Sequence, residues 1–366
     1  PKRNLQPCSL ASLNSRIWLA RSISSWFFFC MLDTLISKAI PVFAITGSDG
    51  KTTSTSVAGE ILRAECARTG EGRVFVGGNI GIPPTSFLEQ TQKGDLVVLE
   101  LSSFQLQNAT RSPEVSAITN ITPNHLNWHT DMQEYADAKR RIYAFAPNRR
   151  LVANAENPTV REMALASGRR VTWFSSLKRS VGEFSSLMHE GDHAIFADRE
   201  GNVRLFDGER ERHLLSAQDI RLPGRHNLEN YMTAIGLTEG YASPESILQV
   251  ARNFRGVAHR LELVCERGGI KYYNSSIDSS PTRTAACVNS FKVPLVVICG
   301  GYDKNIPLEP LGDLFPRRVK HAVLCGATGF LFYSLAKPYH ALGLDWLYFA
   351  MAGVIALGFS LLGSVF

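Results

Sequence analysis

The stretch ITGSDGKTTS, from Ile45 to Ser54, decides the fold of this chain. It follows the apolar, β-branched run AIPVFAIT at residues 39–46, which indicates a buried strand. After it, apolar residues recur at helical spacing from Thr52 to Thr69. A strand, a glycine turn and a helix predict a phosphate-binding loop, because the N–H groups of the turn and of the helix start attract an anion. The loop is a shortened form of the usual motif, since Ile45 stands where a glycine is expected.

Two further strands are expected to bring charged side chains to this loop. The run DLVVLE, residues 95–100, reads as a buried strand that ends in Glu100. Ligands gather at the carboxyl ends of parallel strands, so Glu100 is a candidate metal ligand. The alternative is an ordinary acid at the surface end of a strand. VSAITNI, residues 115–121, predicts a third strand, and His125 lies just beyond it.

The segment MQEYADAKRRIYAFA, residues 132–146, predicts a helix with one apolar face. Lys139 falls on that face, whereas Arg140 does not. A lysine on an apolar stripe usually extends its amine to water. The other interpretation is a specific functional group.

Composition limits the remaining classes of function. The chain has 366 residues, 45% hydrophobic and 20% charged, with a net charge of +6. This length suggests two or three domains, and the chain carries no RNP, zinc-finger or helix-turn-helix signature that would support nucleic-acid binding. The seven cysteines form no CxxC pair, which favours reduced thiols over a disulfide framework or a zinc site.

Beyond Arg149 the sequence predicts a series of short strands and then two helices. The strands are RRLVANAE, RRVTWFS, HAIFAD and VRLFDG, and the first helix lies within LPGRHNLENYMTAIGLTEGY. SPESILQVARNF starts the second helix, with Ser243 as N-cap and Pro244 at the first helical position. RGVAHR reads as a linker. A separate α/β unit then follows, with the hairpin LELVCERGGIKYYN, a helix near residues 280–290, and the strands VPLVVICGG and VKHAVLCGA.

Both ends have unusual composition. Residues 1–38 form an atypical segment that begins with a basic, Ser-rich stretch, which is typical of a transit peptide; the alternative is a fragment or a shifted reading frame. Residues 329–366 are atypical and apolar. Their last 21 residues, 346–366, carry no charge, which is the length of a transmembrane helix; the alternative is a translated artefact.

Several blocks of sequence stand in an order that resembles the Mur ligase family. They are TGSDGKTT, GGNIGIP, LELSSFQL, NHLNWHTDMQEYADAKRRIY, LPGRHNLENYMTA with GVAHRLE, and NSSIDSSPTRTAA with VVICGGYDKNIPLEPLG. The resemblance covers residues 41–328. It implies an α/β fold with a P-loop type, mostly parallel sheet flanked by helices in a central ATP-binding domain, residues 39–256. A partial, Rossmann-like C-terminal domain is then expected at residues 257–328.

The resemblance also implies an activity. The branch of the family with the most similar blocks is an ATP-dependent amide ligase of peptidoglycan precursor synthesis, which adds D-glutamate to UDP-N-acetylmuramoyl-L-alanine through an acyl phosphate. ATP and Mg²⁺ are the expected cofactors, and a monomer in the bacterial cytoplasm is the expected state. The alternatives are a related ligase of the folylpolyglutamate synthase type, a truncated ATP-binding remnant without catalysis, and a membrane-tethered protein.

The family's functional residues map onto this sequence as follows. The resemblance implies ATP binding by Gly47, Ser48, Asp49, Gly50, Lys51, Thr52, Thr53, Asn227, Asn230, His259 and Arg260; metal binding by Thr52, Glu100, His125 and carbamylated Lys139; and substrate binding by Asn79, Ser102 and Ser103. Lys51, Glu100, His125 and Lys139 are the implied catalytic set.

The sequence also departs from the family pattern. No lysine follows in the stretch Asn274–Ile277, where many members have one. We further expect the UDP-binding N-terminal domain and the D-glutamate contacts beyond GATG to be missing.

Overall fold

The computed structural model describes residues 31–80, 82–123, 128–276, 278, 280–301 and 308–326. His125, the GGYDK loop from residue 302 on, most of the N-terminal segment and the apolar segment 329–366 therefore lie outside the described residues. Within the described part, no helix combines the length and apolarity needed to cross a membrane. The chain divides into two compact units, Pro1–Arg255 and Gly256–Phe366.

The first unit is built on a nine-stranded sheet with the order β2-β3-β1-β4-β5-β6-β7-β8-β9. The strands from β2 to β7 in that order run parallel, and β8 and β9 add two antiparallel strands at one edge. Their bounds are β1 Val42–Thr46, β2 Val74–Gly78, β3 Leu96–Glu100, β4 Val115–Ile118, β5 Arg150–Asn154, β6 Arg170–Ser175, β7 His193–Ala197, β8 Asn202–Phe206 and β9 Glu211–Ser216.

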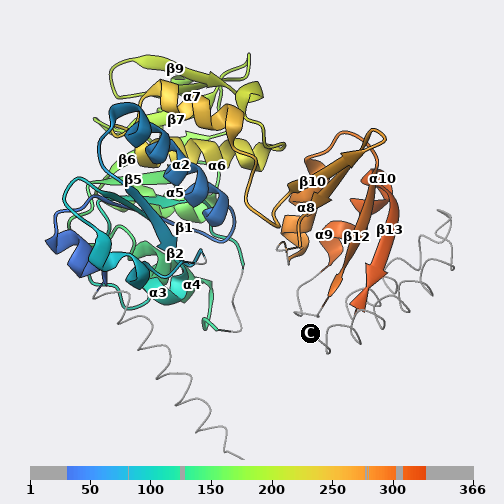
Figure 1. Cartoon of the computed structure of the whole chain (residues 1–366), viewed down its shortest axis with the longest axis horizontal. Coiled ribbons are helices and arrows are strands. Elements are labelled where there is room, and N and C mark those ends of the chain that lie inside the picture. Colours follow the sequence, from blue (N-terminus) through green and yellow to red (C-terminus); the bar gives the residue numbers. More distant parts are fainter. Residues whose placement is uncertain are drawn as a thin grey trace, which may run out of the picture. The chain divides into compact units, whose positions relative to one another are not determined.

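Helices cover both faces of this sheet (Figure 1). On one face lie α2 (Lys51–Thr69), α6 (Arg225–Thr238) and α7 (Pro244–Asn253). On the other lie α3 (Ser103–Leu106), α4 (Met132–Arg140), α5 (Pro158–Leu165) and the helical residues 31–37. Short 3₁₀ turns occur at Pro84–Ser86, Leu88–Gln90, Val181–Phe184 and Ala217–Asp219.

The central strand β1 shows why the apolar runs became buried strands. Val42 and Ala44 point into the core under α4 and α5, whereas Phe43 and Ile45 point into the core under α2 and α6. All five residues of β1 are buried. A parallel strand covered on both faces needs such a continuous apolar sequence, because neither face meets water. The predicted α/β fold with a mostly parallel sheet is therefore confirmed.

The helix predicted over residues 132–146 is shorter than expected. Helix α4 ends at Arg140, and the backbone continues in tight turns. The carbonyl oxygens of Arg141 and Ile142 accept hydrogen bonds from the hydroxyls of Ser112 and Ser116, so they are not available to continue the helix. Ile142 is nevertheless fully buried, so the apolar pattern marked core residues beyond the helix end.

The predicted start of α7 is confirmed, whereas four other elements were not predicted. Ser243 caps α7 by accepting a hydrogen bond from the N–H of Ser246, and Pro244 begins the helix as predicted. The sequence patterns did not predict β2, α3, α5 or β9.

The described residues of the second unit form two small sheets and three helices. A hairpin pairs β10 (Glu262–Arg267) with β11 (Ile270–Asn274), and β12 (Leu295–Gly301) lies parallel to β13 (Val319–Cys325). The helices are α8 (Pro281–Asn289), α9 (Glu309–Gly312) and α10 (Phe315–Arg318).

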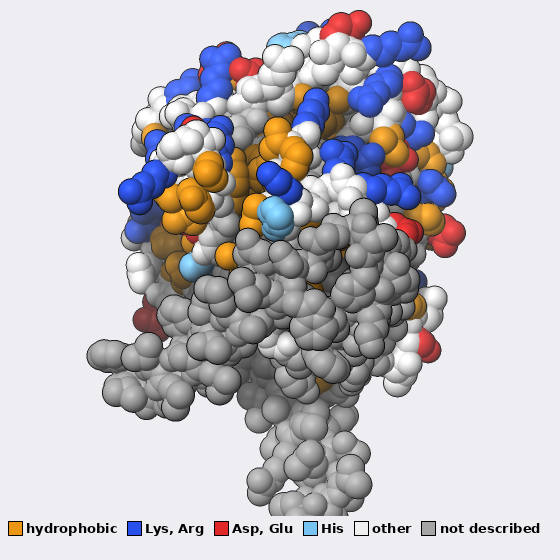
Figure 2. Space-filling model, turned by 90° about the vertical axis from the view of Figure 1, so that its right-hand side faces the viewer, with side chains coloured by type: hydrophobic (Ala, Val, Ile, Leu, Met, Phe, Trp, Pro, Cys, Tyr) orange, Lys and Arg blue, Asp and Glu red, His pale blue; other side chains and the backbone are white. Residues whose placement is uncertain are grey.

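The second unit has a small described core, made by Val288, Leu311 and Phe315. The outer face of the β12–β13 pair is open to solvent, since Val296 is 65% and Ile298 76% exposed. Figure 2 shows hydrophobic side chains of this kind at the surface among lysines and arginines.

Candidate functional site

The loop Gly47–Gly50, here called the phosphate loop, connects the end of β1 to the start of α2. Gly47 has φ 149° and Gly50 has φ 83°, a region that glycine adopts readily. A Cβ on Gly47 would collide with the hydroxyl oxygen of Thr119, and one on Gly50 with the amide oxygen of Asn230. Both glycines are thus required by conformation and by the close approach of neighbouring side chains.

The end of strand β4 holds the phosphate loop in place. Asn120 accepts hydrogen bonds from the N–H of Ser48 (2.8 Å, to its backbone oxygen) and of Asp49 (2.9 Å, to its side-chain oxygen). The Thr119 hydroxyl donates to the Asp49 carbonyl at 2.6 Å. Because Asn120 takes two loop N–H groups, an incoming anion is left with the first-turn N–H groups of α2, which have no partner within the helix.

Lys51 folds back over the loop. Its amine donates to the carbonyl oxygens of Gly47 at 2.8 Å and Ser48 at 3.0 Å. The side chain is half-buried, as is Thr52, whereas Thr53 is buried. The positively charged amine and the start of α2 therefore lie at the same end of β1, which is the arrangement that suits phosphate oxygens.

Glu100 ends the neighbouring strand β3, where it pairs in register with Ile45. Its side chain is buried, and one carboxylate oxygen accepts from the Asn79 amide at 2.8 Å. The other oxygen, Oε2, is buried and has no hydrogen-bond partner among the described residues. A buried carboxylate oxygen without a partner is costly, and it is also the kind of atom that Mg²⁺ prefers.

The described residues contain no group of three His, Cys, Asp or Glu side chains arranged for a metal. The Glu100 Oε2 atom alone, beside the phosphate loop, fits the donor chemistry of a magnesium ion. The other implied ligands are the Thr52 hydroxyl and His125, and His125 lies outside the described residues.

Lys139 on α4 is buried, with 1% of its surface exposed. Its amine donates to the Gly47 carbonyl at 2.9 Å and to the Thr46 hydroxyl at 3.3 Å, and it lies 4.6 Å from the centre of the Tyr135 ring. Burial, aided by the positive charge of Lys51, holds the pKa of Lys139 well below its usual range. Lys139 therefore does not extend to water, and it contacts the phosphate loop directly.

The residues expected to bind substrate lie near Glu100. Ser102 caps α3 through a capping box with Gln105. The Ser103 hydroxyl is 2.9 Å from Nε2 of His129, whose buried ring stacks on Phe104. The sequence analysis did not single out His129, because a histidine four residues after His125 gave no pattern of its own.

Of the two asparagines of α6, Asn230 lies against Gly50 of the phosphate loop, and Asn227 contacts Asn230. Asn230 accepts from the Ser54 hydroxyl at 3.2 Å and donates to the Asn227 side chain at 3.2 Å. Both are buried. Their observed contacts therefore support the start of α2, and an adenine contact remains a prediction.

His259 and Arg260 belong to the second unit. His259 is exposed, with φ 64°, and its ring nitrogen Nδ1 lies 2.8 Å from the Asn274 amide. Arg260 forms an isolated bridge with Val257. Their contact with a nucleotide stays a prediction.

Comparison with known proteins identifies relatives of this chain. The chain is 43% identical over 288 residues to a UDP-N-acetylmuramoylalanine–D-glutamate ligase of Acetivibrio thermocellus, covering 78% of this chain and 58% of the relative. The chain thus spans about three fifths of the length of that curated relative.

Solved structures show the same fold at low sequence identity. A MurF from Acinetobacter baumannii matches with a TM-score of 0.63 and 18% identity, covering 89% of this chain and 71% of that one. A MurF ligase from Thermotoga maritima, solved in complex with ADP, matches with a TM-score of 0.56 and 15% identity, covering 88% of this chain and 74% of that one.

The model of the Mur ligase middle domain matches residues 45–238, which begin within β1 and include the phosphate loop, Glu100, Lys139 and the two asparagines of α6. This match covers more than half of the chain, so the chain belongs to the Mur ligase family.

Proposed function

We propose that this chain catalyses ATP-dependent formation of an amide between UDP-N-acetylmuramoyl-L-alanine and D-glutamate. The proposal is supported by the relative from Acetivibrio thermocellus, which carries that name at 43% identity. It is also supported by the arrangement of the phosphate loop after β1, Glu100 at the end of β3 and Asn230 of α6 within one unit. We place the reaction in the bacterial cytoplasm and expect a monomer.

The chemistry requires little covalent participation from the protein. A carboxylate is a poor electrophile, so transfer of the γ-phosphate from ATP to the substrate carboxylate makes an acyl phosphate and releases ADP. The amine of D-glutamate then attacks the acyl carbon, the new C–N bond forms, and inorganic phosphate leaves. Such a reaction depends on positioning and on neutralising charge.

The chain's own residues have defined tasks in this scheme. The start of α2 and the Lys51 amine bind the phosphates, and Asn120 keeps the loop in its conformation. Glu100 and the Thr52 hydroxyl would hold Mg²⁺, which supplies further neutralisation of phosphate charge when bound. We further propose His125 as a second metal ligand, and Asn79, Ser102 and Ser103 as residues along the muramoyl substrate.

One observation carries the proposal. The Oε2 atom of Glu100 is buried beside the phosphate loop, and no described residue satisfies it, although Asn79 satisfies the other oxygen. A fold stabilised for packing alone would bond both oxygens, because an unmet buried acceptor costs roughly 1–3 kcal/mol. The arrangement instead suits a carboxylate that receives a cation.

Lys139 is proposed to act as a carbamate. The buried amine contacts Gly47 and Thr46 directly, so a carboxyl group added to it would lie at the phosphate loop. Incubation with ¹³C-bicarbonate should give a carbamate signal in the ¹³C NMR spectrum that is missing in Lys139→Met. A spectrum identical in both proteins would refute this role.

The test of the function is phosphate release from ATP, with Mg²⁺ and UDP-N-acetylmuramoyl-L-alanine, measured with and without D-glutamate. Release that requires D-glutamate, together with the amide product in mass spectrometry, supports the proposal. Glu100→Gln serves as the matched inactive variant, because it keeps size and loses the charge. If a folded, ATP-binding protein releases no phosphate in response to D-glutamate, the chain binds nucleotide without ligating.

A further inference from the structure

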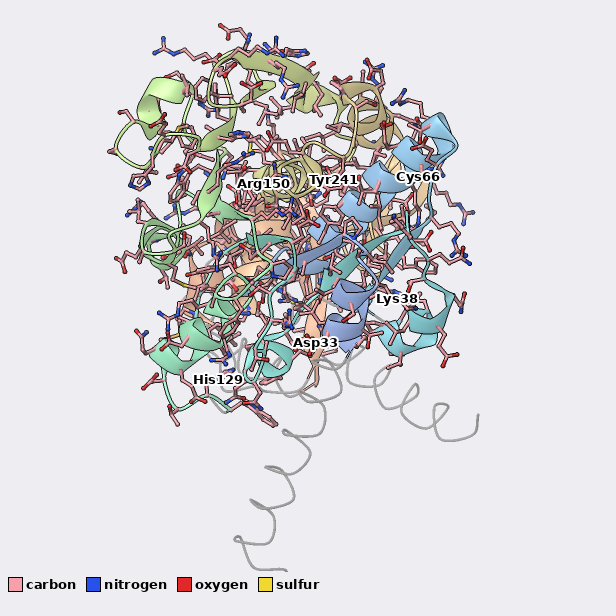
Figure 3. The ribbon with its side chains drawn as sticks, turned by 90° about the vertical axis from the view of Figure 1, so that its left-hand side faces the viewer. Asp33, Lys38, Cys66, His129, Arg150 and Tyr241 are labelled. Atoms are coloured by element: carbon pink, nitrogen blue, oxygen red, sulfur yellow. The ribbon has the colours of Figure 1, made fainter. Side chains whose placement is uncertain are left out.

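A cavity of about 520 Å³ lies in the first unit, at the opposite end of the parallel strands from the phosphate loop. The phosphate loop follows the carboxyl end of β1, whereas Arg150 and Arg170 are the first residues of the parallel strands β5 and β6. The loop after α6, including Tyr241, forms part of the cavity wall. In Figure 3, Arg150 and Tyr241 lie together, well away from His129 at the other end.

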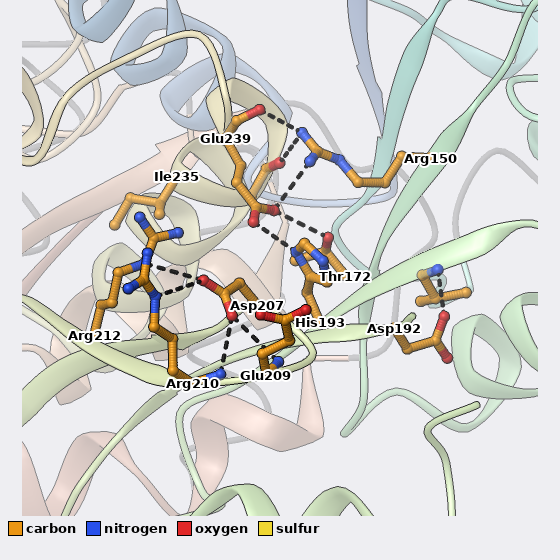
Figure 4. Close-up of polar contacts among 12 residues, drawn as sticks. Arg150, Thr172, Asp192, His193, Asp207, Glu209, Arg210, Arg212, Ile235 and Glu239 are labelled. Carbon is orange, nitrogen blue, oxygen red and sulfur yellow. Dashed lines mark hydrogen bonds and ion pairs between the residues drawn. The ribbon is translucent and has the colours of Figure 1, made fainter. Parts of the chain in front are cut away.

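The inner wall of this cavity is a buried network of charged groups (Figure 4). The Arg150 guanidinium contacts the Glu239 carboxylate at 3.1 Å and donates to the Gly236 carbonyl at 3.1 Å. Nδ1 of His193 lies 2.6 Å from the other oxygen of Glu239. Glu239 is therefore fully engaged by its neighbours, so it does not repel an incoming anion as a free carboxylate would.

The other acids of the lining are engaged as well. Glu65 accepts from Arg68 and from the hydroxyls of Ser243 and Ser246. Asp207 is shared between two guanidinium groups, those of Arg210 at 3.7 Å and Arg212 at 3.4 Å. The single negative charge of Asp207 thus faces two positive charges, of which that of Arg212 belongs to the lining.

Arg170 is the remaining cation of the lining. Its side chain is exposed and forms no direct ion pair within the described part of the chain, although its charge acts on the nearby Glu239 carboxylate. Three arginines and three carboxylates line the cavity, so the formal charges of the lining balance: Arg150, Arg170 and Arg212 against Glu65, Asp207 and Glu239. Arg150 and Arg212 are held in ion pairs, so among the described lining residues Arg170 is the arginine whose guanidinium is left to meet an anion.

The rest of the wall is apolar. It is formed by the buried side chains of Leu205, Leu214, Ile235 and Ile247, which come from β8, β9, α6 and α7. An arginine fork bonds an oxyanion through two parallel N–H groups, and an apolar wall favours a hydrocarbon or ring beside it.

We propose that this cavity binds a small organic anion that carries one phosphate or carboxylate group on an apolar body. Arg170 and Arg212 bind the anionic group, and Leu205, Leu214 and Ile235 contact the apolar part. The site is separate from the nucleotide site and does not depend on the ligase function.

Isothermal titration with phenyl phosphate and with benzoate, at constant ionic strength, tests the proposal. We expect saturable binding of at least one probe, and the tighter probe identifies the anion as phosphate or carboxylate. Arg170→Gln and Arg212→Gln should each weaken binding about tenfold, the loss of one charge-assisted contact. Arg199→Gln is the matched control, because Arg199 is also exposed but lies outside the cavity, and it should change binding less than about twofold.

Lys51→Ala separates this cavity from the phosphate loop. Binding that persists in Lys51→Ala and is lost in Arg170→Gln supports the proposal. Binding lost in Lys51→Ala places the probe at the phosphate loop and overturns it. No saturable binding by either probe, or equal binding by wild type and the Arg170→Gln, Arg212→Gln double variant, also overturns it. Circular dichroism confirms that each variant is folded.

Discussion

Arg150 and Arg149 are neighbours in sequence, and their substitution by methionine should have very different effects on stability. The side chain of Arg150 is 9% exposed and that of Glu239 is 8% exposed. Arg150 also donates to the backbone oxygens of Gly236 and Glu239, at 3.1 and 2.9 Å. Arg149 is 78% exposed, and its guanidinium is 3.7 Å from Glu114.

The expected magnitude follows from what Arg150→Met leaves behind. Methionine keeps the aliphatic stem, but the Glu239 carboxylate loses its buried counter-charge and two carbonyl oxygens lose their donor. Removing one partner of a buried ion pair costs about 3–5 kcal/mol, whereas an exposed pair contributes about 0–1 kcal/mol. For a unit of this size the melting temperature should fall by about 6–20 °C in Arg150→Met. Arg149→Met should change it by only a few degrees.

Urea unfolding followed by far-UV circular dichroism measures both free energies from the midpoint at a shared slope. Combining Arg150→Met with Glu239→Gln should recover part of the loss, because the double variant no longer buries an unpaired charge. If Arg150→Met lowers the free energy of unfolding by less than about 1 kcal/mol, or by no more than Arg149→Met does, the Arg150–Glu239 ion pair does not contribute the stability inferred from its burial.

Three further perturbations test the rest of the structure. Gly47→Ala should abolish nucleotide binding and lower the melting temperature by several degrees, because its Cβ would meet the Thr119 hydroxyl at a positive φ; a nucleotide titration that matches wild type would contradict this. Lys139→Met should keep the fold and the affinity for ATP, and it should lower glutamate-dependent phosphate release at least about 100-fold; unaltered release would show that Lys139 takes no part in the reaction. Hydrogen bonds, first from Arg68, hold the pKa of Glu65 below its ordinary value, so its stabilisation is present above about pH 4.3 and is lost as pH falls through the depressed folded pKa. The difference in urea midpoint between wild type and Glu65→Gln should therefore shrink in acid, and a constant difference would exclude this linkage.

The sequence patterns predicted the centre of the fold because its local signals agree with its packing. Strand β1, the phosphate loop and α2 combine an apolar run, required glycines and helical spacing in one stretch. The end of α4 could not be predicted in this way. Ser112 and Ser116, more than twenty residues away, take the carbonyl oxygens that would have continued the helix.

The candidate site was predicted in part for similar reasons. The position of Lys139 on an apolar face left two interpretations open, an amine extended to water or a functional group, and its burial excludes the first. The strand-end position of Glu100 indicated its place beside the loop. Asn120 lies two residues beyond the end of β4, and a single amide there gave no sign that it would accept two loop N–H groups. Arg170 looked like an ordinary charge at the start of a strand, because the other cavity residues come from distant elements.

Helix α6 contacts both ends of the first unit. Asn230, in the middle of the helix, bonds the Ser54 hydroxyl in the first turn of α2, and Glu239, just after the helix end, bonds Arg150 at the amino end of β5. These two contacts are nine residues apart, which is about 14 Å along the helix axis. For a mutational screen that scores nucleotide affinity, this has a practical meaning. A variant that loses affinity does not locate its defect at the loop, so each such variant needs a stability measurement before its residue is assigned to the nucleotide site.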